Sequence, residues 1–149
     1  STIDDNLLHA LLQRSPVPVT VVKDQASEVM AGSDLLLVAS GTATLQAAVV
    51  GTPMVVLYRT TLPTYWIARC LVQVKWIGLV NLVAGRSIVP ELIQDEATAE
   101  RLWQEARRLL TDRHAYNDMK GGLREVRGLL GEPGASGRAA EVVLAECRA

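Results

Sequence analysis

The stretch LLLVASGTAT, residues 35–44, places four apolar residues close before a small polar turn. The apolar run does not alternate and is too short for a helix, so it predicts a strand buried on both faces, as in a parallel sheet. Residues 42–50 predict a helix that ends at Gly51. Such a turn aims free backbone N–H groups and the positive helix end at one place, where a phosphate can bind. Alternatively, the turn only caps the helix.

This turn lies in a long segment without acidic residues. Residues 35–90 contain no Asp or Glu, but they contain Arg59, Arg69, Lys75 and Arg86. The segment therefore carries +4 in a chain of net charge −1, and the remainder carries −5. Bulk nucleic-acid binding normally needs a basic excess over the whole domain, so we expect no nucleic-acid partner. The local excess instead favours an anionic ligand.

The neighbouring segments continue an alternation of strands and helices. The expected strands cover residues 17–22, 35–38, 53–58 and 77–82. The expected helices cover residues 2–12, 27–30, 42–50, 64–74, 91–110, 115–130 and 139–147. This alternation predicts an α/β fold with a parallel sheet and right-handed crossovers, in one domain over residues 1–149 with C-terminal helices over residues 91–149.

The composition, with 49% hydrophobic and 21% charged residues, is typical of a soluble globular domain. No apolar run reaches the roughly 18 residues of a membrane span, and the first residues lack a signal-peptide pattern. Cys70 and Cys147 have neither metal-ligand nor redox-motif spacing, so we expect free thiols in a reducing cytoplasm. His9 and His114 lack partners at metal-ligand spacing, and we expect neither a metal site nor a nucleophilic triad.

Further candidate ligand contacts follow the later strands. Asn81 and Arg86, with Gly85 between them, are expected at a strand end, where Asn can bond an amide or carbonyl edge and Arg an oxyanion. A surface loop with a turn glycine is the alternative. Glu91, near the start of the expected long helix, either accepts from sugar hydroxyls or complements the helix dipole. Arg59 either faces the ligand or marks a loop.

An aromatic cluster lies between these candidates. Trp66 and Trp76 are flanked by Arg69 and Lys75. Core packing is the first interpretation, and a patch resting on a bilayer is the second, since Trp beside basic residues suits a headgroup layer.

Several short sequence blocks are informative together, through their order and spacing along the chain. They are ASGTATLQ at residues 39–46, GTPMVV at 51–56, YR at 58–59, NLVAGR at 81–86 and VPEL at 89–92. Together they resemble the lipid-A-disaccharide synthase family of GT-B glycosyltransferases. The resemblance runs from about Ile3 to the terminal helix. The NLVAGR-to-PEL blocks are more specific than the SGTAT turn, which other GT-B enzymes share in looser form.

The resemblance implies an activity and a place in a larger fold. The family joins UDP-2,3-diacylglucosamine to 2,3-diacylglucosamine 1-phosphate, releasing UDP and forming a β-1,6-linked disaccharide without a metal or cofactor. GT-B enzymes have two Rossmann-like halves, and this chain resembles the C-terminal half, which binds the UDP-sugar. An enzyme with these lipid substrates is expected in the cytoplasm, peripheral to the inner membrane.

The resemblance also implies site residues. Ser40, Gly41, Thr42 and Ala43 would present backbone or hydroxyl donors to the diphosphate, and Asn81, Gly85 and Arg86 would line the nucleotide pocket with Arg59 and Glu91 as neighbours. Gln46 stands where relatives usually have Glu, a position that meets ribose hydroxyls in looser GT-B relatives. A neutral Gln is expected to bind ribose less strongly than a carboxylate.

Parts of the family's fold have no counterpart in this sequence. The N-terminal half with its candidate base is missing, and so are the first strands of the C-terminal half with their Arg-bearing phosphate loop. We therefore expect the chain to be inactive alone and to need that half, a rearranged sheet, a homodimer or a domain swap. The alternative functions are a UDP-N-acetylglucosamine 2-epimerase, whose acid-rich cleft has no counterpart in residues 35–90, and a membrane-adhering module built on Trp66 and Trp76.

Overall fold

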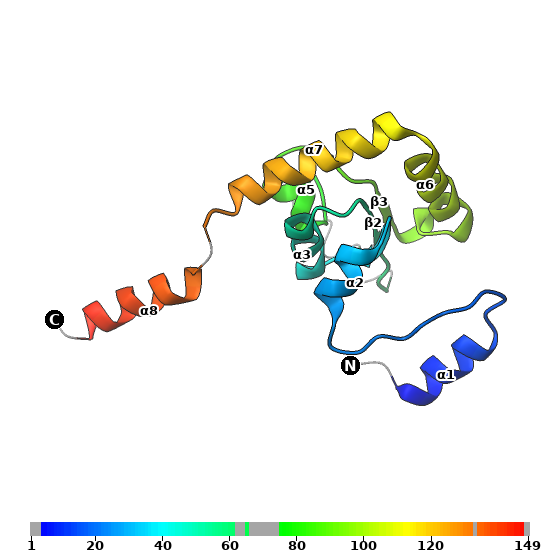
Figure 1. Ribbon diagram of the computed structural model, residues 1–149, viewed down its shortest axis with the longest axis horizontal. Coiled ribbons are helices and arrows are strands. Elements are labelled where there is room, and N and C mark those ends of the chain that lie inside the picture. The colour runs from blue at the N-terminus through cyan, green and yellow to red at the C-terminus, as the bar shows by residue number, and fades with distance from the viewer. Residues whose placement is uncertain (1–3, 62–64, 66–74, 133, 148–149) are drawn as a thin grey trace.

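The computed structural model describes residues 4–61, 65, 75–132 and 134–147 (Figure 1). Within them lies a parallel sheet in the order β1-β2-β3. The strands are β1 (Leu36–Ala39), β2 (Met54–Tyr58) and β3 (Glu91–Ile93). In the register of this sheet, Val38 pairs with Val56, and Val56 pairs with Glu91. The expected α/β fold with a parallel sheet is confirmed.

Helices surround this sheet. They are α1 (Asp5–Gln13), α2 (Ala26–Gly32), α3 (Thr42–Val50), α5 (Leu79–Ala84), η1 (Gln94–Glu96), α6 (Ala99–Thr111), α7 (Arg113–Leu129) and α8 (Ala135–Glu146). Side chains cap several N-termini: Asp4 caps α1, Thr98 caps α6, and Asp112 caps α7. Gly51 ends α3 in the left-handed conformation, with φ of 86°, as the sequence predicts.

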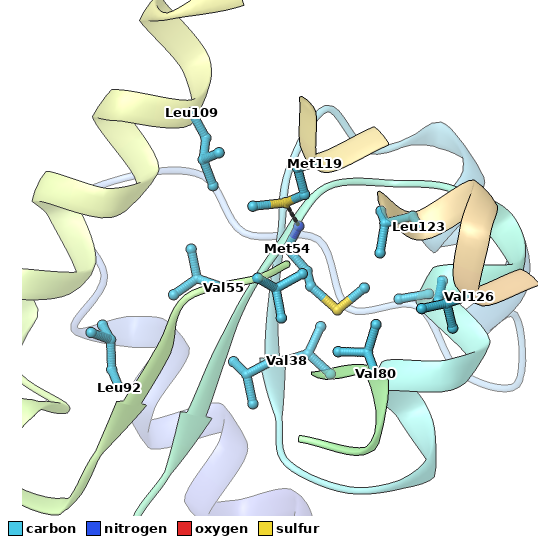
Figure 2. Packing of buried hydrophobic residues seen from close by; sticks show 13 residues of the cluster. Val38, Met54, Val55, Val80, Leu92, Leu109, Met119, Leu123 and Val126 are labelled. Atoms are coloured by element: carbon cyan, nitrogen blue, oxygen red, sulfur yellow. Dashed lines mark hydrogen bonds between the residues drawn. The ribbon is translucent and has the colours of Figure 1, made fainter. Parts of the chain in front are cut away.

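The core lies between the sheet and the helices α3, α5 and α7. Figure 2 shows Val80 of α5 and Leu123 and Val126 of α7 packed beside Met54 and Val38. The thioether of Met119 accepts a hydrogen bond from the backbone N–H of Met54, at 3.3 Å, and so joins α7 to the start of β2 (Figure 2). The helix pairs α3 with α7 and α5 with α7 both pack closely. This layer fixes the position of α5 relative to the sheet.

The strand expected over residues 77–82 is wrong, because the helix α5 begins at Leu79 and includes most of this segment. The carboxylate of Glu91 accepts hydrogen bonds from the backbone N–H groups of Ile77 and Gly78, which satisfies donors at the helix N-terminus. Gly85, with φ of 64°, then ends the helix. An apolar run of strand length therefore became a helix, since the contacts of Glu91 and the packing of Val80 in the core outweighed its β propensity.

The long helix expected over residues 91–110 is wrong in its first part. Residues 91–93 form β3, and the helix α6 begins only at Ala99. Gln94 has a positive φ of 51°, and Thr98 caps α6 by accepting from the N–H of Arg101. Because Thr is a strong N-cap and a positive φ breaks a helix, the amphipathic pattern starts later than expected.

The strand expected over residues 17–22 is also wrong, since this segment has no regular structure. Val17, Val19, Val21 and Val22 are 63%, 54%, 44% and 45% exposed. The strand expected over residues 35–38 was predicted to be buried on both faces. It corresponds to β1, which is buried on one face only, because Leu37 is 53% exposed. A β-branched segment such as residues 17–22 forms a strand only where it can pair with a neighbouring strand. The exposure of Leu37 reflects the position of β1 at the edge of the described sheet.

The remaining predictions concern the ends and the aromatic cluster. Apart from Tyr65, the expected helix over residues 64–74, with Trp66, Arg69 and Cys70, lies outside the described residues. In Figure 1, α8 and α1 extend away from the body of the molecule. Cys147 at the end of α8 is an exposed free thiol. Among the described residues, no helix is both long and apolar enough to cross a membrane.

Candidate functional site

The polar turn joins β1 to α3 at the carboxyl edge of the sheet. Gly41 has φ of 145° and ψ of −163°, a backbone conformation that is essentially restricted to glycine. A Cβ on Gly41 would meet no atom within 4 Å, so the backbone and not the available space requires glycine. As the N-cap residue it has no side chain to cap α3. The first N–H groups of α3 therefore have no cap from that position and can bind an anion.

The turn is connected to the N-terminus of α5. The hydroxyl of Ser40 donates to the backbone carbonyl of Ile77 at 3.3 Å, and the N–H of Ser40 donates to Leu57 of β2 at 2.9 Å. Thr44 is fully buried, and its hydroxyl donates to the carbonyl of Gly41 at 2.8 Å. These bonds hold the turn in place before any ligand binds.

Glu91, the first residue of β3, binds the backbone directly before α5. Its Oε2 accepts from the N–H of Ile77 at 2.8 Å, and its Oε1 accepts from the N–H of Gly78 at 3.0 Å. A Cβ on Gly78 would lie 3.0 Å from Oε1 of Glu91, which is closer than ordinary packing allows. The carboxylate thus binds the N–H groups of the two residues that precede α5, a role that the sequence alone did not indicate.

Asn81 completes the same network from inside the protein. It is fully buried, and its Nδ2 donates to Oε1 of Glu91 at 2.8 Å and to the carbonyl of Val89 at 2.9 Å. Its Oδ1 accepts from the N–H groups of Ile88 and Val89 at 2.8 and 3.0 Å. All four hydrogen bonds that an Asn amide offers are therefore made within the chain. This arrangement favours a positioning role over contact with a ligand.

Gly85 and Arg86 lie at the opposite end of α5. This helix has six residues and spans about 9 Å, so it separates them from the turn at Gly41. The guanidinium of Arg86 pairs with the carboxylate of Glu125 on α7. Arg86 also lines a hollow of about 460 Å³ with Arg108 and residues of α7. The structure therefore does not bring Arg86 together with the turn.

Gln46 and Arg59 are two further predicted site residues. Gln46 lies on the second turn of α3, and its Nε2 donates to the hydroxyl of Ser27 on α2 at 2.8 Å. Its side-chain carbonyl has no partner among the described residues, so it remains available as an acceptor. Arg59 follows β2, is exposed, and pairs with no carboxylate within the described ranges.

Gln94 is a residue that the sequence analysis missed. It is 8% exposed, its Oε1 accepts from the N–H of Thr60 at 2.7 Å, and its Nε2 donates to the carbonyl of Thr60 at 3.0 Å. These two bonds fix the chain directly after Arg59, at the end of β2. The only hint in the sequence is a Gln that directly follows the apolar pair Leu92-Ile93.

The fold and this edge define a Rossmann-like α/β unit in which a glycine turn without a side-chain cap follows the first described strand. The family model described as lipid-A-disaccharide synthetase matches residues 2–139. The chain belongs to the lipid-A-disaccharide synthase family.

Named relatives agree with this assignment. The chain is 46% identical over 143 residues to lipid-A-disaccharide synthase of Myxococcus xanthus (strain DK1622), covering 96% of this chain and 37% of the relative. For the enzyme of Anaeromyxobacter dehalogenans (strain 2CP-1 / ATCC BAA-258) the identity is 48% over 130 residues, with coverage of 87% and 34%. For that of Geobacter sulfurreducens it is 40% over 144 residues, with coverage of 97% and 38%.

The chain spans little more than a third of the length of these curated relatives and matches their C-terminal portion. This coverage agrees with the expectation of a part of a larger GT-B enzyme.

Proposed function

We propose that this chain is the donor-binding part of an enzyme that joins UDP-2,3-diacylglucosamine to 2,3-diacylglucosamine 1-phosphate and releases UDP. Family membership supports the reaction. The observation that carries the donor role is the uncapped turn at Gly41, which hydrogen bonds join to the N-terminus of α5. The parent enzyme would act at the cytoplasmic face of the inner membrane, where its lipid substrates lie.

The turn would bind the diphosphate of the donor. Backbone N–H groups of Gly41, Thr42 and Ala43 and the hydroxyl of Thr42 are the proposed donors, whereas the hydroxyl of Ser40 would hold the turn through its bond to Ile77. Because the turn is held by bonds to Leu57 and Ile77, little reorganisation is needed as charge grows on the departing UDP. The base that activates the acceptor hydroxyl would come from the N-terminal half of the parent enzyme.

The remaining candidate residues divide into contacts and supports. We assign the ribose contact to the free carbonyl of Gln46 and an electrostatic contact with the diphosphate to Arg59. Asn81 and Glu91 would position the start of α5 rather than touch the donor. Gly85 ends α5, and Arg86 ties the following loop to α7. A homodimer or a domain swap remains a prediction for the parent protein.

Calorimetry of UDP binding to the full-length protein tests this proposal. Wild type is compared with Ser40→Ala, which removes a turn hydroxyl, and with Ser136→Ala, an exposed Ser on α8. We expect several-fold weaker UDP binding for Ser40→Ala and unchanged binding for Ser136→Ala. Equal UDP affinity in all three proteins would contradict the assignment of the turn. A product assay with both lipid substrates tests the reaction, since an epimerase would convert the donor without an acceptor.

A further inference from the structure

Gln94 holds an uncommon backbone conformation directly after β3. Its φ of 51° lies in the left-handed region, and among the residues that the structure describes Asp24 is the other non-glycine residue with a positive φ. This region is unfavourable for a residue with a Cβ, and Gly, Asn and Asp adopt it more readily than Gln does. Such conformations persist where surrounding contacts determine them, and they are concentrated at functional sites. The contacts of the Gln94 side chain therefore indicate what this conformation achieves.

These contacts continue the pairing of β2 with β3 after the backbone ladder has ended. The last register pair of the two strands is Tyr58 with Ile93. Beyond it, the Oε1 of Gln94 accepts from the N–H of Thr60 at 2.7 Å, and its Nε2 donates to the carbonyl of Thr60 at 3.0 Å. A primary amide carries both an acceptor and donors, so it can bind both backbone groups of one residue. Thr60 is thus fixed although it lies outside β2.

The amide of Gln94 makes these bonds in the protein interior. The residue is 8% exposed, and its own backbone carbonyl accepts from the N–H of Ala97 at 3.1 Å. Hydrogen bonds are stronger where the local dielectric is low, and little water is present there to replace them. Gln94 is therefore a rigid support for Thr60.

Arg59 lies between two fixed residues. Tyr58 before it is the last residue of β2, and Thr60 after it is held by Gln94. Arg59 itself is exposed, and its guanidinium pairs with no carboxylate in the part of the chain that the structure describes. The backbone of Arg59 is therefore ordered on both sides, while its positive charge is not neutralised by an ion pair there.

The register of the sheet brings Arg59 beside the turn at Gly41. Ala39 of β1 pairs with Leu57 of β2, and Gly41 and Arg59 each lie two residues beyond this pair. Neighbouring strands are about 4.8 Å apart, so the two residues leave the sheet side by side. The positive charge of Arg59 therefore lies near the N-terminus of α3, where Gly41 provides no side-chain cap.

We propose that Gln94 is a positioning residue that holds Arg59 ready for the diphosphate of the UDP-sugar. This role rests on the donor-binding function proposed above. Gln94 would not touch the donor. By fixing the backbone after Arg59, it lowers the conformational entropy that the chain loses when the guanidinium binds. A neutral amide suits this position, because a carboxylate could not donate to the carbonyl of Thr60 and would add negative charge near the diphosphate.

Calorimetry of UDP binding to the full-length protein tests this role. Gln94→Met keeps a similar volume and removes both bonds to Thr60. Arg59→Gln is expected to weaken UDP binding about tenfold, the value of one charge-assisted hydrogen bond, and Gln94→Met about fivefold. The matched control is Gln104→Met on α6, where the glutamine is exposed. We expect this control to bind UDP like wild type.

A double-mutant cycle and a second ligand separate positioning from general support of the fold. If Gln94 acts through Arg59, the double variant Arg59→Gln, Gln94→Met should bind UDP within about twofold of Arg59→Gln alone, whereas independent effects would multiply to about fiftyfold. Uridine lacks the diphosphate, so its affinity, measured by competition with UDP, should be the same in wild type and in both single variants.

Gln94→Asn removes the contacts without adding backbone strain. Asn adopts the left-handed region readily, but its side chain is one methylene too short to reach Thr60. We expect it to unfold thermally near wild type and to weaken UDP binding as Gln94→Met does. Wild-type UDP affinity in Gln94→Asn or Gln94→Met, a multiplicative double variant, or an equal loss of uridine affinity would each overturn the positioning role alone. A wild-type protein that does not bind UDP would overturn the donor-binding proposal and this one together.

Discussion

The amide of Asn81 donates to the carboxylate of Glu91 at 2.8 Å, in the protein interior between α5 and β3. The same carboxylate holds the backbone that leads into α5, and the same amide holds the backbone that leads into β3. Two polar residues ten positions apart thus fix the helix start beside the proposed diphosphate site. They define the first two predictions.

Asn81→Ala is expected to lower the free energy of unfolding by about 3 kcal/mol, because it leaves backbone groups of residues 88 and 89 without partners and removes one of three donors from the Glu91 carboxylate. Urea unfolding of the full-length protein measures this. Asn117→Ala, on the exposed surface of α7, is the matched control and should change stability by less than about 0.5 kcal/mol. Equal stability of the two variants would contradict the role of Asn81 as a buried clamp.

Glu91→Gln is expected to destabilise the protein by about 2 kcal/mol. A neutral amide offers one acceptor oxygen, so its NH₂ group would face either the N–H of Ile77 or the donors of Gly78 and Asn81. Asp95→Asn removes an exposed acid and serves as the control. If Glu91 instead contacted the sugar directly, donor affinity would fall while the urea midpoint stayed unchanged, and the two measurements together decide between these roles.

Gly41→Ala is expected to cost about 2 kcal/mol of stability and to weaken UDP binding, because Ala cannot adopt the backbone angles of the turn without strain. Gly121→Ala is the counterpart within α7, where a Cβ meets no atom within 4 Å. Since Ala is the better helix former, this control should gain about 0.5–1 kcal/mol. Thermal unfolding and calorimetry provide the two readouts. A Gly41→Ala protein that binds UDP like wild type would count against the turn.

Gln46→Glu is expected to strengthen UDP binding about threefold. A carboxylate makes stronger hydrogen bonds to ribose hydroxyls than an amide carbonyl does, and the hydroxyl of Ser27 can donate to it instead of accepting. Gln46→Leu removes the acceptor and should weaken binding. Affinities that do not respond to either substitution would place the ribose elsewhere.

Local chemistry explains which parts of the fold the sequence predicted. The strands near residues 36–39 and 54–58 and the helix over 42–50 followed from apolar runs between a clear turn and the αL glycine Gly51. The assignment of residues 77–82 failed because the backbone before α5 is held by Glu91, more than ten residues later. No window of local sequence contains that contact.

The candidate site shows the same limit. Ser40 and Gly41 were recognisable because their function depends on a local turn. Asn81 was noticed as a polar residue in an apolar run, but its burial and its four internal bonds depend on where β3 and the loop at residues 88–89 pack. Gln94 was missed because its partner Thr60 is 34 residues away.

The lengths of the two connections in the sheet also imply an order of folding. Residues 40–53 join β1 to β2, whereas residues 59–90, more than twice as many, join β2 to β3. Closing the longer loop costs more chain entropy, by roughly 0.6 kcal/mol for each doubling. The β1–α3–β2 unit, with the turn at Gly41 inside it, is therefore expected to form first, and Glu91 reaches α5 only when the third strand arrives. Hydrogen exchange during refolding should protect the amides of Leu36 and Ser40, which donate to Pro53 and Leu57, before the amide of Gly78.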